Sequence, residues 1–183
     1  MKLQKTPFSA APYMERAKEI LSKMTLTEKI GQLNLTGTVR SLDENMIREA
    51  KIGNFLNVPD VATANRRQRI AVEESRMGIP LLIGHDVVHG DRTLFPIPLA
   101  TAASWDMERI EKCEMLAAKE AYHEGINWIY SPMIDVTREP RWGRIAEGAG
   151  EDKFFGSCVA QARVRGFQTI NPETGFPYTA ACF

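Results

Sequence analysis

The sequence has few cysteines and no long apolar run. Its three cysteines, Cys113, Cys158 and Cys182, are widely separated. An odd number of scattered cysteines does not suit a disulfide framework or a CxxC zinc site, so we expect reduced thiols that pack as small apolar residues. No stretch reaches the roughly 18 apolar residues of a membrane span, and residues 1–20 hold no apolar core of signal-peptide length. These absences predict a cytoplasmic protein.

An excess of charge of either sign is also missing. Lys plus Arg and Asp plus Glu number 23 each in 183 residues, and no basic run is interleaved with aromatics. We therefore expect neither a nucleic-acid partner nor a membrane partner. A GxGxxG fingerprint, a Walker-type lysine loop and a G-x-S-x-G elbow are absent too. Gly148 and Gly150, which precede a predicted helix, leave a phosphate-binding α/β domain as one alternative.

Histidines are scarce, with three in the whole chain. His85 and His89 have HxxxH spacing, but the pair straddles a strand end and a turn instead of lying on a helix. His123 lies in a helical pattern with no partner nearby in sequence, and no Cys or Asp cluster has zinc-like spacing. The sequence therefore predicts no metal site and no cofactor.

Apolar strands alternate with helices along the chain. Strand patterns occur near 52–58, 79–85, 126–131 and 178–183, and helical patterns near 13–24, 27–33, 61–77, 104–124 and 152–167. Thr25 and Glu28 predict a capping box, Ser104 a helix cap, and Gly78 and Gly125 helix ends. Strands buried on both faces and joined by helices predict an α/β fold with parallel strands. Four strands make either a small open sheet or half of a (β/α)8 TIM-type barrel, which needs about 250 residues. The chain stops inside an apolar strand, which favours the incomplete barrel.

Two loops, 86–103 and 133–151, are too long to be simple connectors. Both follow the carboxyl end of a strand, where α/β folds bind ligands. Carboxylates beside arginines suit sugar hydroxyls, with tryptophan stacking on the sugar face. The alternative for each charged residue is an ion pair that braces the loop, or, for Asp152, a cap on the next helix. The charged residues in question are Asp86, Arg92, Asp135, Arg138, Glu139, Arg141, Arg144, Glu147, Glu151 and Asp152.

These segments resemble glycoside hydrolase family 3, in particular its bacterial β-glucosidase branch. The matching stretches are MTLTEKIGQLN (24–34), GNFLNV (53–58), RMGIPLLIGHDVVHGDRTLFPIPLATAASWD (76–106) and INWIYSPMIDVTREPRWGRIAEGAGED (126–152). The resemblance implies an N-terminal (β/α)8-type barrel followed by an α/β sandwich domain. It also implies hydrolysis of terminal β-glycosidic bonds with retention, through a covalent glycosyl-enzyme. Residues 1–183 are then expected to be the N-terminal portion of the barrel domain, without the rest of the barrel or the sandwich domain.

The resemblance assigns roles to four residues. Asp86 and Arg144 are expected to bind the terminal glucose, Arg92 to line the same subsite, and Glu147 to orient Arg144. From the residues alone, Asp86 and Glu147 would also suit a reacting pair, because a retaining glycosidase needs two carboxyl groups ~5–5.5 Å apart. The resemblance instead implies that the nucleophilic aspartate, the acid/base glutamate and a Lys-His pair follow residue 183. No catalytic residue is therefore expected in this chain, and the fragment alone is expected to be inactive.

The expected ligand is a small-molecule β-glucoside or oligosaccharide. Two alternatives stay within the family: a β-xylosidase and an N-acetyl-β-glucosaminidase. The sequence HDVVHGDRTLFP (85–96) argues against an N-acetyl-β-glucosaminidase. The choice between glucose and xylose depends on residues beyond 183. A third alternative is a non-catalytic carbohydrate-binding remnant.

Overall fold

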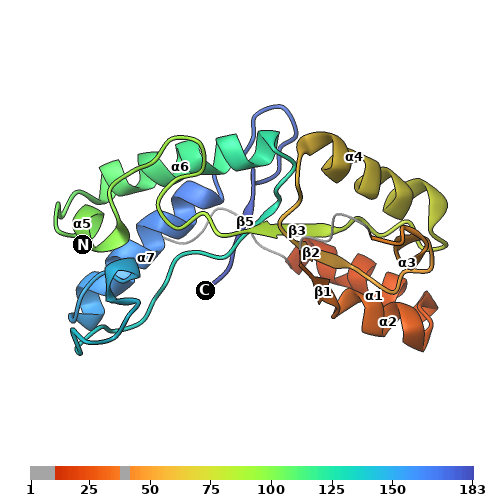
Figure 1. Ribbon diagram of the computed structural model, residues 1–183, viewed down its shortest axis with the longest axis horizontal. Coiled ribbons are helices and arrows are strands. Elements are labelled where there is room, and N and C mark those ends of the chain that lie inside the picture. The colour runs from red at the N-terminus through yellow and green to blue at the C-terminus, as the bar shows by residue number, and fades with distance from the viewer. Residues whose placement is uncertain (1–10, 38–41) are drawn as a thin grey trace. The chain divides into compact units, whose positions relative to one another are not determined.

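The computed structural model describes residues 11–37 and 42–183, and it divides into two compact units, Met1–Gly84 and His85–Phe183 (Figure 1). Residues 1–10, which belong to the stretch without a signal-peptide core, lie outside the described residues. Within the described ranges, no helix has both the length and the apolar character needed to cross a membrane.

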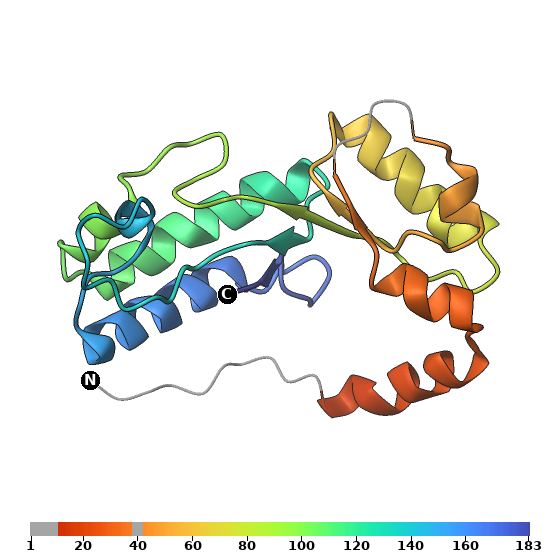
Figure 2. The same ribbon diagram turned by 60° about the horizontal axis from the view of Figure 1, so that its bottom comes forward.

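The first unit holds three parallel strands. In β2 and β3, Phe55 lies opposite Ile83, and both side chains are fully buried. Helix α4 lies along one side of these strands (Figures 1 and 2), where the Arg67 guanidinium stacks 4.7 Å from the Phe55 ring centroid. The elements of this unit are η1 (Ala11–Tyr13), α1 (Met14–Lys23), α2 (Leu26–Gln32), β1 (Leu35–Thr36), α3 (Asn45–Arg48), β2 (Asn54–Leu56), α4 (Val61–Arg69), the π-helix η2 (Ile70–Glu74) and β3 (Leu82–His85), whose last residue belongs to the second unit.

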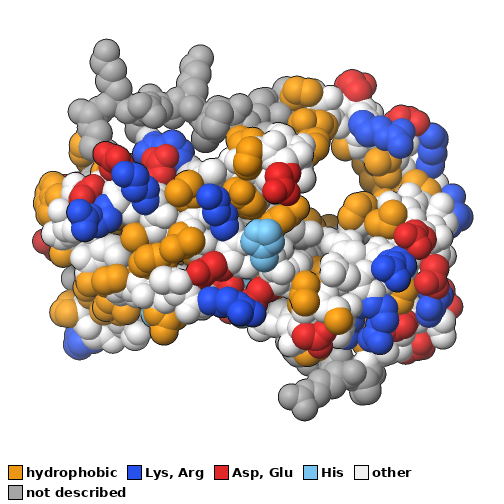
Figure 3. All heavy atoms as spheres, turned by 90° about the horizontal axis from the view of Figure 1, so that it is seen from above, with side chains coloured by type: hydrophobic (Ala, Val, Ile, Leu, Met, Phe, Trp, Pro, Cys, Tyr) orange, Lys and Arg blue, Asp and Glu red, His pale blue; other side chains and the backbone are white. Residues whose placement is uncertain are grey.

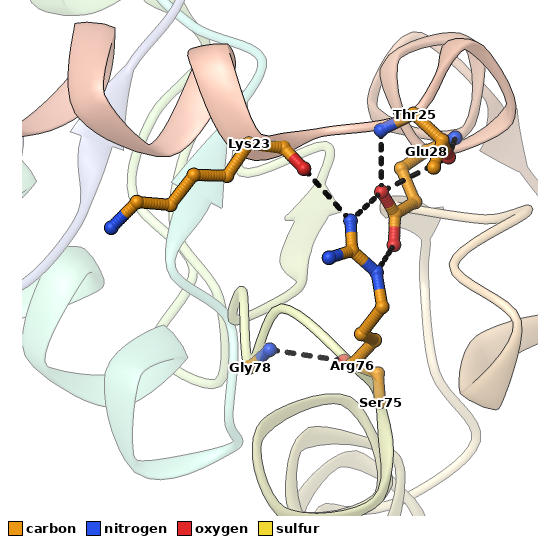
Figure 4. Close-up of polar contacts among 6 residues, drawn as sticks. All are labelled: Lys23, Thr25, Glu28, Ser75, Arg76 and Gly78. Atoms are coloured by element: carbon orange, nitrogen blue, oxygen red, sulfur yellow. Dashed lines mark hydrogen bonds and ion pairs between the residues drawn. The ribbon is translucent and has the colours of Figure 1, made fainter.

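The predicted capping box of α2 is present and has a third partner. The Thr25 side chain accepts from the Glu28 backbone N–H, and the Glu28 carboxylate accepts from the Thr25 N–H at 2.7 Å. Arg76 donates to the same carboxylate from Nε at 2.9 Å and from Nη2 at 2.5 Å. Its Nη2 also donates to the Lys23 carbonyl oxygen (Figure 4). The cap therefore ties α2 to the segment just before β3.

In the second unit, α6 and α7 lie side by side (Figures 1 and 2). Gly166 permits their close approach, because a Cβ there would lie 2.5 Å from the Glu111 carbonyl oxygen and 2.6 Å from Glu114 Cβ. Ile110, Val159 and Ala162 form the buried core at this contact. The elements are α5 (Pro98–Ala102), α6 (Met107–His123), β4 (Trp128–Ile129), η3 (Ile145–Glu147), α7 (Lys153–Phe167) and β5 (Ala180–Ala181), with β4 and β5 parallel.

The predicted α/β class with parallel strands is confirmed. All four predicted strands are present, each shorter than its apolar run. Strand β1 was not predicted, because two residues directly after a helix make no apolar run of their own. The predicted helix 61–77 is α-helical only to Arg69 and continues as the π-helix.

The prediction that Ser104 caps α6 is wrong. The N-cap is Asp106, whose carboxylate accepts from the Arg109 backbone N–H at 2.9 Å. Trp105 has φ +57°, a left-handed conformation that keeps residues 104–105 out of the helix. Ser104 instead accepts from the Asp106 N–H through its hydroxyl. Asp152, in contrast, caps α7 by accepting from the Phe155 N–H at 2.7 Å.

Basic and acidic side chains are mixed over the face drawn in Figure 3, with apolar side chains between them. No large region of a single sign stands out on this face, in keeping with the balanced composition.

We predict that Arg76→Met lowers the free energy of unfolding by about 1–2 kcal/mol, because it removes charged hydrogen bonds from a buried carboxylate whose Arg partner is partly exposed. The Glu28 side chain is 8% exposed. Urea denaturation at neutral pH measures the loss. The control is Arg16→Met, which breaks the exposed α1 ion pair with Glu19 and is expected to cost less than about 0.5 kcal/mol. Equal losses in the two variants would contradict the prediction.

This contribution is also expected to depend on pH. The Arg76 hydrogen bonds, with help from Thr25, lower the pKa of Glu28 from 4.5 to about 2. A lowered folded-state pKa stabilises the fold above the unfolded value of 4.5, and the stabilisation is lost as the pH falls from there through about 2. The stability difference between the wild type and Arg76→Met should therefore shrink over this range in acid titrations followed by circular dichroism.

Candidate functional site

The carboxyl ends of β3 and β4 meet in the second unit. The Tyr130 N–H, directly after β4, donates to the carbonyl oxygen of His85, the last residue of β3, at 3.1 Å. The Val87 N–H donates to the same oxygen at 3.2 Å, and the Val87 side chain is fully buried. Asp86 lies between them with an exposed side chain. A tight turn at the strand end therefore presents this carboxylate to solvent.

Helix α6 holds the loop that follows Asp86. The Glu120 carboxylate accepts from the backbone N–H groups of Arg92 and Thr93 and from the Thr93 hydroxyl, at 2.6–3.0 Å. Gly90, with φ +115°, is required in this turn because a Cβ there would lie 2.0 Å from the Thr93 carbonyl oxygen. Three donor groups of this turn are thus bonded to helix α6.

Arg92 is engaged at the end of α6. Its Nε pairs with the Glu124 carboxylate, which is the first cause that raises the pKa of Arg92. The side chain is 76% exposed. Glu124 is the C-cap residue of α6, so this arginine also fastens the first loop to the helix. Its assignment to a sugar subsite stays a prediction.

The second loop carries Arg144 and Glu147. The loop is closed at its base by a hydrogen bond from the Thr137 N–H to the Gly150 carbonyl, at 3.1 Å. Arg144 donates Nε and Nη2 to the two oxygens of Glu147 at 3.1 and 2.7 Å, and Nη2 lies 3.3 Å from Met133 Sδ. This bidentate pair fixes the plane of the guanidinium while leaving 57% of the Arg144 side chain exposed.

Asp86 and Arg144 share one electrostatic neighbourhood. The Glu147 hydrogen bond is the main cause that raises the pKa of Arg144, and the charges of Asp135 and Asp86 raise it further. The same bond lowers the pKa of Glu147. An exposed guanidinium that is paired with one carboxylate and lies near others can donate a hydrogen bond to a hydroxyl oxygen. The same hydroxyl can donate a hydrogen bond to one of the carboxylates. Such pairs of donors and acceptors orient sugars.

Other charges of the second loop brace the loop locally. Arg141 donates Nε and Nη2 to the carboxylate of Glu139 at 2.7 and 2.8 Å, and this bond holds the pKa of Glu139 at about 2. Both residues are exposed, and Arg141 is the more exposed at 88%. This pair offers a matched comparison for the Arg144–Glu147 pair on the same loop.

Sequence reasoning missed Tyr130, which lies near Asp86, and Asp91, which lies near His85. Burial, and then the charge of Asp86, raise the pKa of Tyr130, whose buried hydroxyl has no hydrogen-bond partner among the described residues. Burial likewise raises the pKa of Asp91, whose carboxylate lies 3.9 Å from His85 Nε2. The signal that could have identified Tyr130 from the sequence is its position directly after the predicted strand.

Of the histidine pair singled out in the sequence, His89 makes contacts within the turn that follows β3. His89 Nδ1 lies 3.0 Å from the Phe95 carbonyl oxygen, and the Phe95 N–H donates to the His89 carbonyl at 2.8 Å. Over residues 11–37 and 42–183, no group of three or more His, Cys, Asp or Glu side chains is arranged to hold a metal ion.

Comparison with known proteins identifies the family of the chain. The sequence model described as glycosyl hydrolase family 3 N terminal domain matches residues 25–174. The chain belongs to this family. The resemblance drawn from the two long loops is therefore confirmed, although it names the family and not the residues that act.

Relatives in the family carry glucosidase and xylosidase names. The periplasmic β-glucosidase of Salmonella typhimurium is 37% identical over 84% of this chain and 21% of its own length. The periplasmic β-glucosidase/β-xylosidase of Dickeya chrysanthemi is 29% identical over 86% of this chain and 29% of its own. The crystal structure of a β-glucosidase from Listeria innocua in complex with glucose has a TM-score of 0.78 at 33% identity, and the match covers 92% of this chain and 26% of that one. These likenesses confirm the predicted fold, the first part of a family-3 barrel.

The prediction of a cytoplasmic location is wrong. Two of the relatives above are periplasmic proteins. The three cysteines are free in the structure, but unpaired thiols do not fix the compartment, because a domain with a sufficient apolar core needs no disulfide. The chain also spans less than a third of the length of these relatives.

We predict that Arg144→Met raises the pKa of Glu147, because the carboxylate loses its bidentate partner. Titration of the carboxyl carbons by NMR measures this change. Arg141→Met is the matched control. It should raise the pKa of Glu139 from about 2 and leave that of Glu147 unchanged. A Glu147 pKa that is the same in the wild type and in Arg144→Met would rule out the pairing.

Proposed function

We propose that this chain supplies the sugar-binding subsite of a retaining, exo-acting β-glucosidase that removes terminal non-reducing β-D-glucosyl residues. The chain covers between a fifth and a third of its relatives, so the activity is proposed for the full-length protein. In it, residues 1–183 are the N-terminal portion of the barrel domain. The nucleophilic aspartate and the acid/base glutamate are contributed by residues after 183.

The observation that carries the proposal is the shared neighbourhood of Asp86, directly after β3, and Arg144, on the loop that follows β4. Asp86, an exposed carboxylate, accepts from glucose hydroxyls. Arg144, whose plane is set by Glu147, donates to hydroxyl oxygens of the same sugar. Each charged hydrogen bond contributes roughly 1.5–3 kcal/mol, and together they fix the anomeric carbon for attack.

Retention requires two carboxyl groups ~5–5.5 Å apart across the anomeric carbon. Both oxygens of Glu147 already accept from Nε and Nη2 of Arg144, and the lowered pKa of Glu147 is opposite to what a general acid needs. This supports a positioning role for Glu147 and not a role in bond cleavage. Arg92, paired with Glu124, is proposed to border the subsite from the first loop.

We predict that Asp86→Ala and Arg144→Ala each lower kcat/KM of the full-length protein for aryl β-glucosides at least about 10-fold, the factor that one lost charged hydrogen bond produces. Steady-state kinetics with a nitrophenyl β-glucoside measure the loss. The control Arg141→Ala removes an arginine of the same loop that pairs only within the loop, and it should change kcat/KM less than about 2-fold. Near-normal activity in both test variants would refute the assignment.

A second substrate is tested in the same assay. One relative is named β-glucosidase/β-xylosidase, so a nitrophenyl β-xyloside is included beside the glucoside. A higher kcat/KM for the xyloside would assign the protein as a β-xylosidase. Binding of either sugar without any turnover by the full-length protein would instead indicate a carbohydrate-binding remnant.

We also predict that the purified 183-residue chain does not hydrolyse aryl β-glucosides, because it holds the subsite without the two reacting carboxyl groups. Release of nitrophenol measured over many hours, with intact full-length protein as the positive control, tests this. Turnover that survives removal of contaminating glucosidases by a second purification would overturn it.

A further inference from the structure

The second unit contains one buried ion pair that reaches the loop of Asp86. Arg163 on α7 donates Nε to the Glu114 carboxylate on α6 at 2.6 Å, and the two side chains are 3% and 7% exposed. The Arg163 Nη2 donates to the carbonyl oxygen of Val88 at 2.5 Å. Val88 is two residues after Asp86 and 75 positions before Arg163 in the sequence.

The contact between Arg163 and Val88 fixes the backbone that follows Asp86 in the sequence. Before Asp86, the His85 carbonyl accepts from the Tyr130 N–H, so the residue after β4 holds the residue before Asp86. After Asp86, the buried Val87 side chain and the Arg163 bond to the Val88 carbonyl hold the next two residues. The exposed carboxylate is thereby carried by a backbone that is fastened on both sides.

Fold stability alone does not explain why this pair is charged. Desolvation makes a buried ion pair no better for stability than apolar side chains of similar volume. Gly166 already lets the two helices pack closely, and their contact is lined with fully buried alanines. An apolar pair would fill the same space. It would not donate a hydrogen bond to the Val88 carbonyl.

We propose that Arg163, aligned by Glu114, is a positioning residue that holds Asp86 in place for sugar binding. The inference rests on the proposed role of Asp86 in binding glucose. Arg163 touches no substrate; it acts through two peptide units of the loop. Two further anchors of the same loop come from α6 and its C-cap, through Glu120 and Glu124, so the helix pair α6 and α7 supports residues 88–93 of the first loop.

The test replaces the ion pair in the full-length protein with the double variant Glu114→Met/Arg163→Met, which keeps the interior filled and leaves no unpaired buried charge. We expect kcat/KM for a nitrophenyl β-glucoside to fall about 10-fold or more, because displacement of a binding group by about 1 Å can cost up to 100-fold. The matched control is Glu111→Met/Arg165→Met. It removes an ion pair between the same two helices that includes no loop residue, and it should change kcat/KM less than about 2-fold.

A double-mutant cycle separates positioning from a general loss of structure. In an Asp86→Ala background, removal of the Glu114–Arg163 pair should change kcat/KM less than about 2-fold, because the group that it positions is gone. The same 10-fold fall in both backgrounds, or no fall when Asp86 is present, overturns the inference alone. An Asp86→Ala variant with normal kcat/KM refutes the proposed function and this inference with it.

If circular dichroism shows that the double variant does not fold, a milder variant tests the same positioning role. Arg163→Lys keeps a positive charge opposite Glu114, but a single ammonium group lacks the fork that reaches Glu114 and Val88 together. A fall in kcat/KM that is abolished by Asp86→Ala supports the inference. Unchanged kcat/KM in Arg163→Lys, with the Val88 amide chemical shift altered in NMR spectra, contradicts it.

Discussion

The hydrogen bond from the Tyr130 N–H to the His85 carbonyl is the contact on which the site depends. It joins the residue after β4 to the last residue of β3, so the two loops that follow these strands begin side by side. Parallel strands always end at the same edge of their sheet, and each needs a crossover before the next begins. The charged residues of two segments nearly 50 positions apart, such as Asp86 and Asp135, therefore act on one guanidinium, that of Arg144.

Much of the fold follows from local sequence patterns. Apolar runs located β2, β3, β4 and β5, and the Thr25–Glu28 spacing predicted the capping box of α2. What failed had a conformational or a tertiary cause. Ser104 has the chemistry of a cap, but the left-handed φ of Trp105 moves the cap to Asp106. Strand β1 exists because Leu35 and Thr36 pair with β2, and no pattern in two residues shows that pairing.

The candidate site was accessible from the sequence only in part. The two loops were located by length and by their place after strands, and the structure brings Asp86 and Arg144 into one field. The supports of the first loop were not visible. Glu120 and Arg163 lie in helical patterns that read as ordinary surface or interior, and their loop contacts bridge 27 and 75 positions. Single-sequence periodicity reports on neighbours along a helix, so it carries no trace of such contacts.

The two loops differ in how far their contacts reach along the chain. The first is fastened by residues of α6 and α7, whereas the ion pairs of the second, Glu139–Arg141 and Arg144–Glu147, join residues two or three positions apart. A substitution in the first loop must suit two helices at once. The ion pairs of the second loop lie between Thr137 and Gly150, whose mutual hydrogen bond closes the loop, while η3 contacts α5 and Ala149 packs against the core. Substitution of a charged residue in the second loop is therefore expected to disturb a local ion pair, whereas substitution of an anchored residue in the first loop disturbs a link to α6 or α7.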